Sequence, residues 1–399
     1  MKKSQVPRYM RAVNAQQAEE FRRQTAAGEY DLDADEAWWR DRSQILEDHG
    51  YQLRSRLRPG WVPSWQDSDK NPLFCEDSTG RCTRKVVDAV RQSDERDVAV
   101  MNISRDSDER EILDYVMEAQ RSSGDDNHIA PILETFEDDR EPELKFYVMP
   151  LLRKFDKPPF VAVSEILELF RQLLEALIFL HSIHVTHRDC SLGNIMMDAP
   201  SIFPRGFHPT NIATDRGGVF SITTIPRYKA TGPIRYYLID FGISRIYEPD
   251  EEHLYIGDDG ADRDIPELSD DVAYDPFRAD VFILGNILKK HFIPMYKNLD
   301  FLSPLANAMT AANPLDRPTA VEAQKQFNSI VRSQSFVSLR RRLVRKDEVK
   351  NRKSVIYEDV GILLDAALYP VRVVIGFPSQ TIGALRGLIK PKSSKGKTA

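Results

Sequence analysis

The sequence has few cysteines, no long apolar run and only a small excess of negative charge. Its three cysteines (Cys75, Cys82 and Cys190) form neither a CxxC pair nor a metal-ligand spacing, which argues against a disulfide framework and favours a reducing compartment. No uncharged apolar run reaches the ~18 residues that suggest a membrane span, and no secretory signal is expected. A net charge of -6 on 399 residues gives no reason to invoke nucleic acid. We therefore expect a soluble protein of the cytoplasm or nucleus.

Apolar patterning predicts a strand-rich part ahead of a helix-rich one. Apolar residues lie on both sides of a polar turn, over residues 86–90 and 97–103, which is the pattern of a hairpin. Residues 108–119 carry apolar side chains at helical spacing. Two more strands are expected over residues 129–136 and 144–152. Five strands and one helix are the simplest assembly of this part.

The helix-rich part opens with a broad apolar face over residues 164–181, where Ser164 is suited to cap the helix N-terminus. Two further helices are expected, over residues 277–291 and 318–331. We divide the predicted domain, residues 41–335, into a strand-rich unit over about 41–152 and a helix-rich unit over about 153–335. The fold class is therefore α+β.

Four segments fall outside this pattern. Residues 1–40 are charged and rich in Ala, Gln and Glu, and we expect a mobile extension. The aromatic stretch that includes Trp61 and Trp65 is expected to form a cap on the strand-rich unit, with the tryptophans as core. Residues 199–234 are too long for a simple turn and predict an inserted excursion. The basic and apolar tail, residues 336–399, either lies on an anionic membrane surface, binds a partner, or folds back on the helices.

The residues that carry chemistry are concentrated in two short motifs. His187-Arg188-Asp189 is followed by Asn194, and the run YYLIDFG places Asp240 at the end of an apolar strand. Phosphoryl transfer needs an aspartate to receive a hydroxyl proton, and an asparagine and a second aspartate to hold Mg²⁺ on the phosphates. Either motif alone is a weak signal, but both together in this order are a strong one.

With these motifs, residues 86–331 resemble the eukaryotic protein kinases. The resemblance is closest to a group of kinase-like proteins of mushroom-forming fungi, and it extends through LRPGWVPSW, MMDAPSIFPRGFHP, YYLIDFGISRIY and YDPFRADVFILGNIL. It implies a bilobal kinase-like fold, with a small β-rich lobe and a larger helical lobe. It also implies ATP and Mg²⁺ as cofactors.

The resemblance assigns roles residue by residue. It makes Asp189 the catalytic base, and Asn194 and Asp240 the Mg²⁺ ligands. Arg188 pairs with a phosphate on the activation segment in the family. Met149 falls at the gatekeeper position. The adenine would be held at the hinge that follows, where the Pro150 carbonyl is retained and the Leu152 N–H can donate.

Four further residues match positions that support the site. Glu267, after Pro266, and Arg317 match a glutamate and an arginine that pair in the larger lobe. Asp280 matches the helix aspartate that supports the catalytic loop backbone. His187 is expected to be a packed, hydrogen-bonded histidine and not a proton carrier.

The sequence departs from the family at the phosphate contacts. Met101 stands where kinases have a lysine that pairs with the phosphates, and a thioether cannot donate a hydrogen bond. The glutamate partner of that lysine would be Glu109, with Glu111 as the second choice. Lys85, or Arg84 beside it, could supply the missing cation from the preceding strand, as in the with-no-lysine kinases, or both could be solvated.

Two more departures affect the same function. The glycine-rich loop is reduced to Gly80 in EDSTGRCTRKVV, so close backbone approach to phosphates is poorly supported. Ser191 stands where serine/threonine kinases carry a lysine that steadies the γ-phosphate. Cationic groups around a transferring phosphate are worth several kcal/mol, so these losses bear directly on activity.

The activation segment, residues 240–267, is acidic and has no threonine. We hypothesise that one of its carboxylates replaces the phosphate that would pair with Arg188, so that the segment is ordered without a phosphorylation switch. The alternative is a solvated acidic loop. A requirement for phosphorylated Tyr255 would contradict the hypothesis.

Three functions remain open at this point. The first is a serine/threonine protein kinase, whose partner is a protein substrate and not nucleic acid. The second is a pseudokinase that acts as a binding or scaffold module with weak nucleotide affinity. The third is a small-molecule phosphotransferase, against which Arg188, Glu267 and Arg317 argue, because they belong to the protein-substrate segment.

Overall fold

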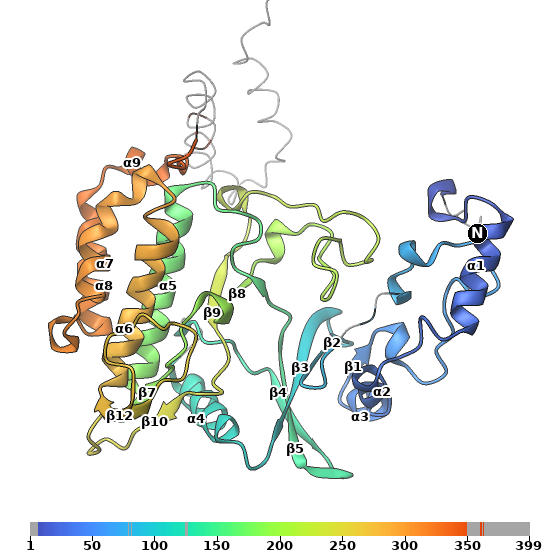
Figure 1. Cartoon of the computed structure of the whole chain (residues 1–399), viewed down its shortest axis with the longest axis horizontal. Coiled ribbons are helices and arrows are strands. Elements are labelled where there is room, and N and C mark those ends of the chain that lie inside the picture. The colour runs from blue at the N-terminus through green and yellow to red at the C-terminus, as the bar shows by residue number, and fades with distance from the viewer. Residues whose placement is uncertain are drawn as a thin grey trace, which may run out of the picture.

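Figure 1 shows the computed structural model of the chain, which describes residues 7–78, 80, 82–123, 127–348, 360 and 362. The helices in this part of the chain are α1 (Ala15–Ala26), α2 (Ala34–Arg40), α3 (Ser43–Asp48), α4 (Asp108–Ser123), α5 (Val163–Ser182), α6 (Pro276–Ile287), α7 (Ser303–Met309), α8 (Ala320–Ser333) and α9 (Phe336–Arg340). The strands are β1 (Tyr51–Leu53), β2 (Val86–Arg91), β3 (Arg96–Ser104), β4 (Glu134–Asp138), β5 (Glu141–Pro150), β6 (Arg153–Lys154), β7 (Val185–Thr186), β8 (Ile195–Asp198), β9 (Arg235–Leu238), β10 (Arg245–Ile246), β11 (Tyr255–Gly257) and β12 (Ser269–Tyr274). The fold is thus mixed, as α+β implies.

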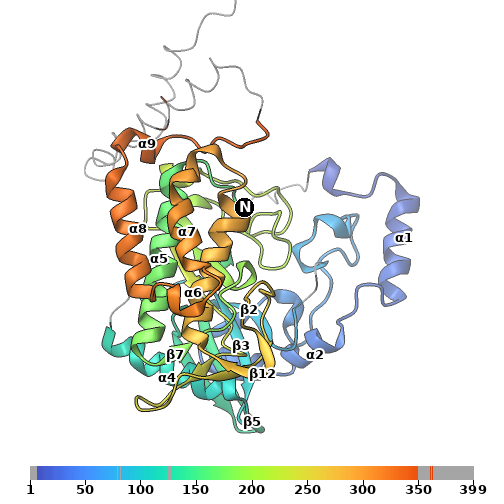
Figure 2. The ribbon, with the colours of Figure 1, turned by 60° about the vertical axis from the view of Figure 1, so that its left-hand side comes forward.

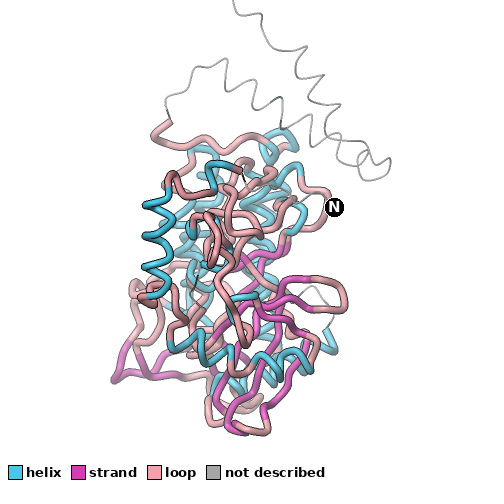
Figure 3. Tube along the Cα trace, turned by 90° about the vertical axis from the view of Figure 1, so that its right-hand side faces the viewer, coloured by secondary structure: helices cyan, strands magenta, loops and turns pink. Residues whose placement is uncertain are grey.

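The strand-rich part is a five-stranded antiparallel sheet in the order β1-β2-β3-β5-β4. The predicted hairpin is present as β2 and β3, and the predicted helix is α4. Most strands gather in the lower part of Figure 3. One face of the sheet is covered by the segment before it, because Trp39, Leu46 and Leu57 are fully buried against β2, β3 and β5. Trp39 is thus part of this core, whereas Trp65 is buried beside Tyr30 outside it and Trp61 is half-buried.

The segment predicted as a mobile extension carries α1 and most of α2 before residue 40. Asp33 and Glu36 form a capping box at the start of α2, which positions Trp39 in the sheet core. Glu36 is also buried and forms an ion pair with Arg56, with nitrogen–oxygen distances of 2.8 and 2.9 Å. Helix α1 lies at the end of the molecule opposite α8 in both views (Figures 1 and 2). The 1–40 boundary therefore falls at the end of a helix that is packed into the sheet unit.

Two predicted element boundaries are wrong. The strand expected over residues 129–136 begins only at Glu134, because Pro131 has no N–H to give to a strand ladder. Ile129 instead forms a parallel bridge with Leu238 of β9, outside the five-stranded sheet. Ser164 does not cap α5, which already begins at Val163, and the carboxylate of Glu165 accepts the N–H groups that precede the helix.

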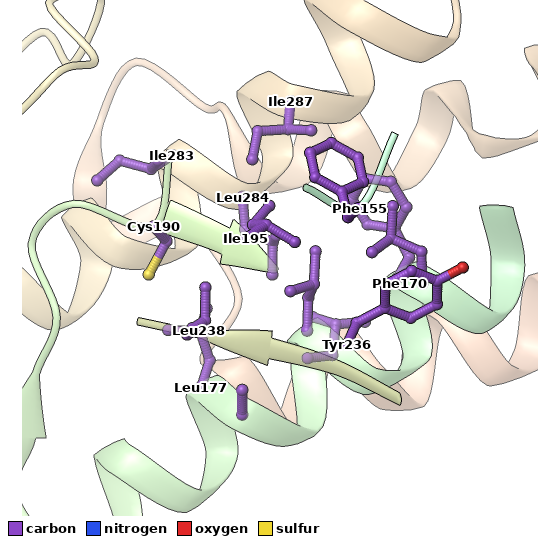
Figure 4. Close-up of a cluster of buried hydrophobic side chains, with 14 of the residues drawn as sticks. Phe155, Phe170, Leu177, Cys190, Ile195, Tyr236, Leu238, Ile283, Leu284 and Ile287 are labelled. Atoms are coloured by element: carbon purple, nitrogen blue, oxygen red, sulfur yellow. The ribbon is translucent and has the colours of Figure 1, made fainter. Parts of the chain in front are cut away.

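The helix-rich part is built around α5, which packs against α6 and α8. The predicted helices over residues 277–291 and 318–331 are present as α6, with the π-helical turn Leu288–Phe292 after it, and as α8. Figure 4 shows side chains from α5 and α6 meeting those of the β8–β9 pair, with Phe170, Ile195 and Leu238 among them. This core fixes the strands that carry the two motifs.

The start of the predicted tail folds back on the helices. Leu343 is buried, and its N–H donates to the Val161 carbonyl at 2.7 Å. Apart from residues 360 and 362, the tail from residue 349 onward lies outside the described residues. Among the described residues, none of the helices combines the length and the apolar character that a membrane crossing would require.

Candidate active site

A cavity of about 330 Å³ lies where the five-stranded sheet meets the β8–β9 pair. Its walls come from β2, β3, α4, the β5–β6 connection and the residues that follow β9. Five of the residues predicted to bind a cofactor or metal line it: Lys85, Glu109, Met149, Leu152 and Asp240. Most of the remaining lining is apolar, and Met101 is part of it. Asp240 therefore lies in one cavity with the residues predicted to contact the nucleotide, whereas Arg188, Asp189 and Asn194 are not part of its lining.

The β8–β9 pair brings the two predicted metal ligands together. Ile195 pairs with Leu238 in the antiparallel register, so Asn194 directly precedes one strand and Asp240 closely follows the other. The Ile239 N–H donates to the Asn194 carbonyl at 3.0 Å, which extends the pairing toward the site. Asp240 adopts a left-handed backbone with φ of 69°, a conformation that is uncommon for aspartate and recurs at functional sites.

Asp189 and Asn194 are hydrogen-bonded to each other. The Asn194 amide nitrogen donates to the Asp189 carboxylate at 2.9 Å and to the Asp189 carbonyl at 3.0 Å. The other carboxylate oxygen of Asp189 accepts the N–H of Ala261 at 3.2 Å. Because the amide nitrogen of Asn194 is occupied by Asp189, its amide oxygen is the atom left for a cation.

The oxygen donors fit Mg²⁺. Mg²⁺ prefers oxygen ligands and is usually bound by one or two carboxylates together with substrate phosphates and water. Asp240 and Asn194 supply one carboxylate and one amide oxygen. Within the described residues, no group of three His, Cys, Asp or Glu side chains could hold a metal by itself. This set therefore fits a cation that arrives with a phosphate and does not fit a metal held by the protein alone.

The catalytic-loop backbone is supported from below by Asp280, as expected from the sequence. Its fully buried carboxylate accepts the N–H of His187 at 2.9 Å and the N–H of Arg188 at 2.6 Å. Arg188 has a φ of 66°, and these bonds hold that strained backbone in place. His187 is buried and contacts the Ile239 carbonyl at 3.1 Å, and burial lowers the pKa of its imidazole. It is a packed histidine, as predicted.

One member of this network was missed at the sequence level. His181, to which the sequence assigned no role, contacts the Asp280 carboxylate through Nε2 at 3.1 Å. It sits in the last turn of α5, and only the packing of α5 against α6 brings the two residues together. No spacing rule in a single sequence would have indicated this contact.

Lys85 supplies a positive charge beside Met101, which has none. Its Nζ atom lies 2.9 and 3.2 Å from the two carboxylate oxygens of Glu109. The register pairs Met101 with Val86, and the Asn102 N–H donates to the Lys85 carbonyl at 3.0 Å, so the lysine backbone is fixed beside Met101. Glu109 lies in the first turn of α4, where the helix dipole favours a carboxylate.

The choice between the two candidate glutamates is settled by burial. Glu109 is 7% exposed and faces the cavity, whereas Glu111 is exposed. Arg84 does not line the cavity, and its guanidinium lies over the ring of Trp38, 5.3 Å from the centroid. Lys85 is the cation that the fold brings to this point.

Gly80 does not serve the cavity. A Cβ atom there would lie 2.6 Å from the Glu36 carboxylate and 3.2 Å from the Arg56 guanidinium, so the glycine allows close approach to that buried ion pair. The residues on either side of it are not described. The wall of the cavity near this point is formed by Lys85 and Val86.

Arg188 contacts the acidic segment, as hypothesised. Its guanidinium lies 3.1 Å from the Asp259 carboxylate and stacks on the ring of Tyr255, 3.3 Å from the centroid. The Tyr255 hydroxyl donates to the same carboxylate at 2.9 Å. This hydrogen bond first, and the arginine second, hold the pKa of Asp259 below its ordinary value. Asp259 is the carboxylate that occupies the position opposite Arg188.

The end of the segment is held by an ion pair that was also expected. Arg317 is buried, and its guanidinium is bidentate to Glu267 at 2.5 and 2.7 Å. The same guanidinium lies over the ring of Phe282. Such paired geometry is the strong form of an arginine–carboxylate contact.

A larger hollow of about 770 Å³ follows α5 on another side of the molecule. Its lining includes Glu168, Arg171 and Glu175, which form ion pairs with one another. None of the predicted site residues lies in it. The smaller, more apolar cavity therefore remains the candidate site.

Comparison with known proteins gives no family. The sequence matches no family model and no curated protein.

Proposed function

We propose that this chain is a protein-kinase-like enzyme that transfers the γ-phosphate of ATP to serine or threonine hydroxyls of a protein substrate. The observation that carries the proposal is the Lys85–Glu109 ion pair, which lines the same cavity as Asp240. A cation and a metal-binding carboxylate in one cavity are what a triphosphate requires. The proposal includes a bilobal kinase-like fold akin to that of the kinase-like proteins of mushroom-forming fungi.

The apolar part of the cavity suits an adenine ring. Met149 lines the cavity, and Leu152 follows on the connection to β6. The Leu151 N–H donates to the Asp97 carbonyl at 3.2 Å. We assign the adenine contacts to the Pro150 carbonyl and the Leu152 N–H, as proposed from the sequence. Pockets of this kind combine apolar walls with a few polar groups that fix orientation.

Asn194 and Asp240 would hold Mg²⁺, which neutralises charge on the phosphates when it is bound. Lys85 would contact the phosphates from the opposite wall, and Glu109 keeps its ammonium oriented. Asp189 accepts the proton of the substrate hydroxyl as the new O–P bond forms. The P–O bond to the departing ADP breaks in the same displacement. The hydrogen bond from Asn194 orients the Asp189 carboxylate for this step.

A pseudokinase is the second candidate, and Met101 is the observation that favours it. Met101 lines the cavity without a charge, and Gly80 packs against the Glu36–Arg56 pair instead of approaching a phosphate. Ser191 removes a further cation. In that case the protein binds nucleotide weakly or not at all, and its partners are proteins.

The proposal predicts that the purified chain binds ATP more tightly with Mg²⁺ than with EDTA, because Asp240 and Asn194 engage the phosphates through the metal. Calorimetric titration under both conditions measures this. Incubation with γ-labelled ATP then measures transfer to the chain itself and to a general protein substrate. Mg²⁺-dependent binding without transfer supports the pseudokinase, and no binding under either condition contradicts the enzyme.

The Asp259 contact gives a separate prediction. Asp259→Asn removes the charge that pairs with Arg188, and we expect transfer activity to fall by about two- to fivefold, the range of a partly exposed ion pair. Asp258→Asn is the matched control, because its carboxylate is paired with Arg263 and not with Arg188. Equal activity of the two variants, or a requirement for phosphorylated Tyr255, would refute the role of Asp259 as the permanent replacement for a phosphate.

A further inference from the structure

The inserted segment 199–234 leaves the end of β8 and lies between the helices and the N-terminal segment (Figure 1, yellow-green). It is rooted in the helix-rich core, because Ile202 and Phe203 are buried there. Arg153 of β6 lies over the rings of Phe203 and Phe207, at 5.1 and 5.2 Å from their centroids. The segment is therefore anchored beside β6, which pairs with β8, the strand that supplies Met196 to the cavity.

Its middle contacts the opposite wall, at the start of β3. The Arg216 guanidinium lies 2.6 Å from the Asp97 carboxylate and donates to the Glu95 carbonyl at 3.4 Å. Beside it, Arg96 forms an ion pair with Asp198, the last residue of β8, at 2.8 Å. Burial raises the pKa of Asp97, and the Arg216 charge opposes that rise. Two ion pairs thus join the β2–β3 hairpin to the segment and to its root.

A second contact reaches the N-terminal cap through His208, which is fully buried. Its Nδ1 accepts the N–H of Asn211 at 3.0 Å, so the ring proton lies on Nε2 and points to the Glu76 carboxylate at 3.3 Å. Glu76 is 3.4 Å from Arg54, which in turn pairs with Asp88 of β2 at 2.9 Å. A chain of hydrogen-bonded and charged side chains, from His208 through Glu76 and Arg54 to Asp88, therefore connects the segment to a second strand of the cavity wall.

The packing around His208 is tight. Gly218 has a φ of 69°, and a Cβ atom there would lie 3.1 Å from the imidazole Cδ2. Burial would raise the pKa of Glu76, but the bond from His208 and the charge of Arg54 lower it overall. The carboxylate is therefore a charged acceptor for both partners.

We propose that residues 199–234 form a strap that fixes the separation of the two cavity walls, with Arg216 and His208 as positioning residues for the bound nucleotide. The strap joins β2 and β3, which supply Val86, Ala99 and Met101 to the cavity, to the strand that supplies Met196. Because the glycine-rich loop is reduced, it offers few contacts with which a bound nucleotide could draw the β2–β3 wall toward the opposite wall. The strap holds the two cavity walls together before a nucleotide binds. Less conformational entropy is therefore lost when the nucleotide binds. The nucleotide part of this inference rests on the proposed function.

The test compares Arg216→Ala with the wild-type protein. We expect the dissociation constant and KM for Mg-ATP to rise by about two- to fivefold, the range of a partly exposed ion pair, with kcat unchanged. Arg91→Ala is the control, because Arg91 pairs with Asp94 within the hairpin itself and does not contact the strap. The double variant Asp97→Arg with Arg216→Asp restores an ion pair of reversed polarity and is expected to recover binding.

Hydrogen exchange gives a readout that needs no nucleotide. Amides of β3 that line the cavity should exchange faster in Arg216→Ala, and faster still when His208→Ala is added, but not in Arg91→Ala. Faster exchange without any Mg-ATP binding by the wild-type chain would support the strap and contradict the proposed function. Unchanged exchange, or an unchanged dissociation constant in a chain that binds Mg-ATP, would overturn the strap.

Discussion

Lys85→Met is expected to reduce phosphoryl transfer by about 10²- to 10³-fold, the cost of removing one preorganised electrostatic contact from an active site. Lys85 is the single cation among the described residues that line the cavity. Its loss leaves Glu109 as an unpaired carboxylate on the wall that should receive phosphates, so repulsion is added to the lost attraction. Single-turnover transfer from γ-labelled ATP, together with calorimetric Mg-ATP binding, measures both parts of the effect.

Two further variants separate this role from a structural one. Arg84→Met removes a neighbouring cation that lies over Trp38 outside the cavity, and it should leave transfer within about twofold of wild type, as expected for a surface position. Adding Met101→Lys to Lys85→Met returns a cation to the same cavity from β3, and we expect it to recover much of the lost activity. Full activity in Lys85→Met alone would exclude Lys85 as the phosphate contact.

The parts of the site that could be predicted from the sequence are those in which the residues lie within or next to a recognisable motif. Asn194 and Asp240 come together because each borders an apolar strand, and an antiparallel pair places such ends side by side. The partners of Asp280 and Arg317 were expected from the family resemblance, and both contacts are present. Lys85 was one of two candidates, and only the folded structure distinguishes them, because the Lys85 ammonium contacts Glu109 in the cavity and the Arg84 guanidinium lies over Trp38.

Contacts between distant segments could not be predicted in this way. Trp39 is buried against β2, β3 and β5, which lie far along the chain from it, and composition alone could not distinguish such docking from a mobile extension. His208 and Arg216 lie in a segment without regular periodicity, so nothing in their spacing indicated partners in Glu76 and Asp97. Pro131 did carry a usable signal, because a proline argues against an interior strand position.

The proposed chemistry needs a base with metal ligands and a set of phosphate contacts, and the structure changes how complete the phosphate contacts are. The sequence retains the predicted base and metal ligands but lacks usual phosphate contacts, because Met101 and Ser191 replace lysines and only Gly80 remains of the glycine-rich loop. The fold returns one cation through Lys85 and connects the wall that carries it to the rest of the site through the 199–234 strap. Among the described residues that line the cavity, no second cation replaces the lysine that Ser191 stands for. The phosphate contacts are therefore replaced in part, which favours slow phosphoryl transfer over a complete loss of transfer.

Asp189→Asn is the variant that tests the base directly, and we expect it to lower the rate of transfer by about 10²- to 10⁴-fold, the usual contribution of general base catalysis. The change leaves size and shape intact but removes the group that receives the hydroxyl proton. Mg-ATP binding should be unchanged, because Asn194 and Asp240 supply the cation's ligands. Comparing binding with single-turnover transfer separates the two effects.

The hydrogen bonds around Asp189 make a second expectation possible. Both carboxylate oxygens accept hydrogen bonds, one from the Asn194 amide and one from the Ala261 N–H. An asparagine can accept only one of them and must turn its own NH₂ group toward the other donor. We therefore expect a loss of about 1–3 kcal/mol in the free energy of unfolding, measured by urea denaturation.

The activity measurement can contradict the role of Asp189. If Asp189→Asn retains transfer within about tenfold of wild type, a factor of ten being only 1.4 kcal/mol of barrier, Asp189 is not the base. In that case the two motifs mark a nucleotide-binding module whose chemistry is done elsewhere or not at all.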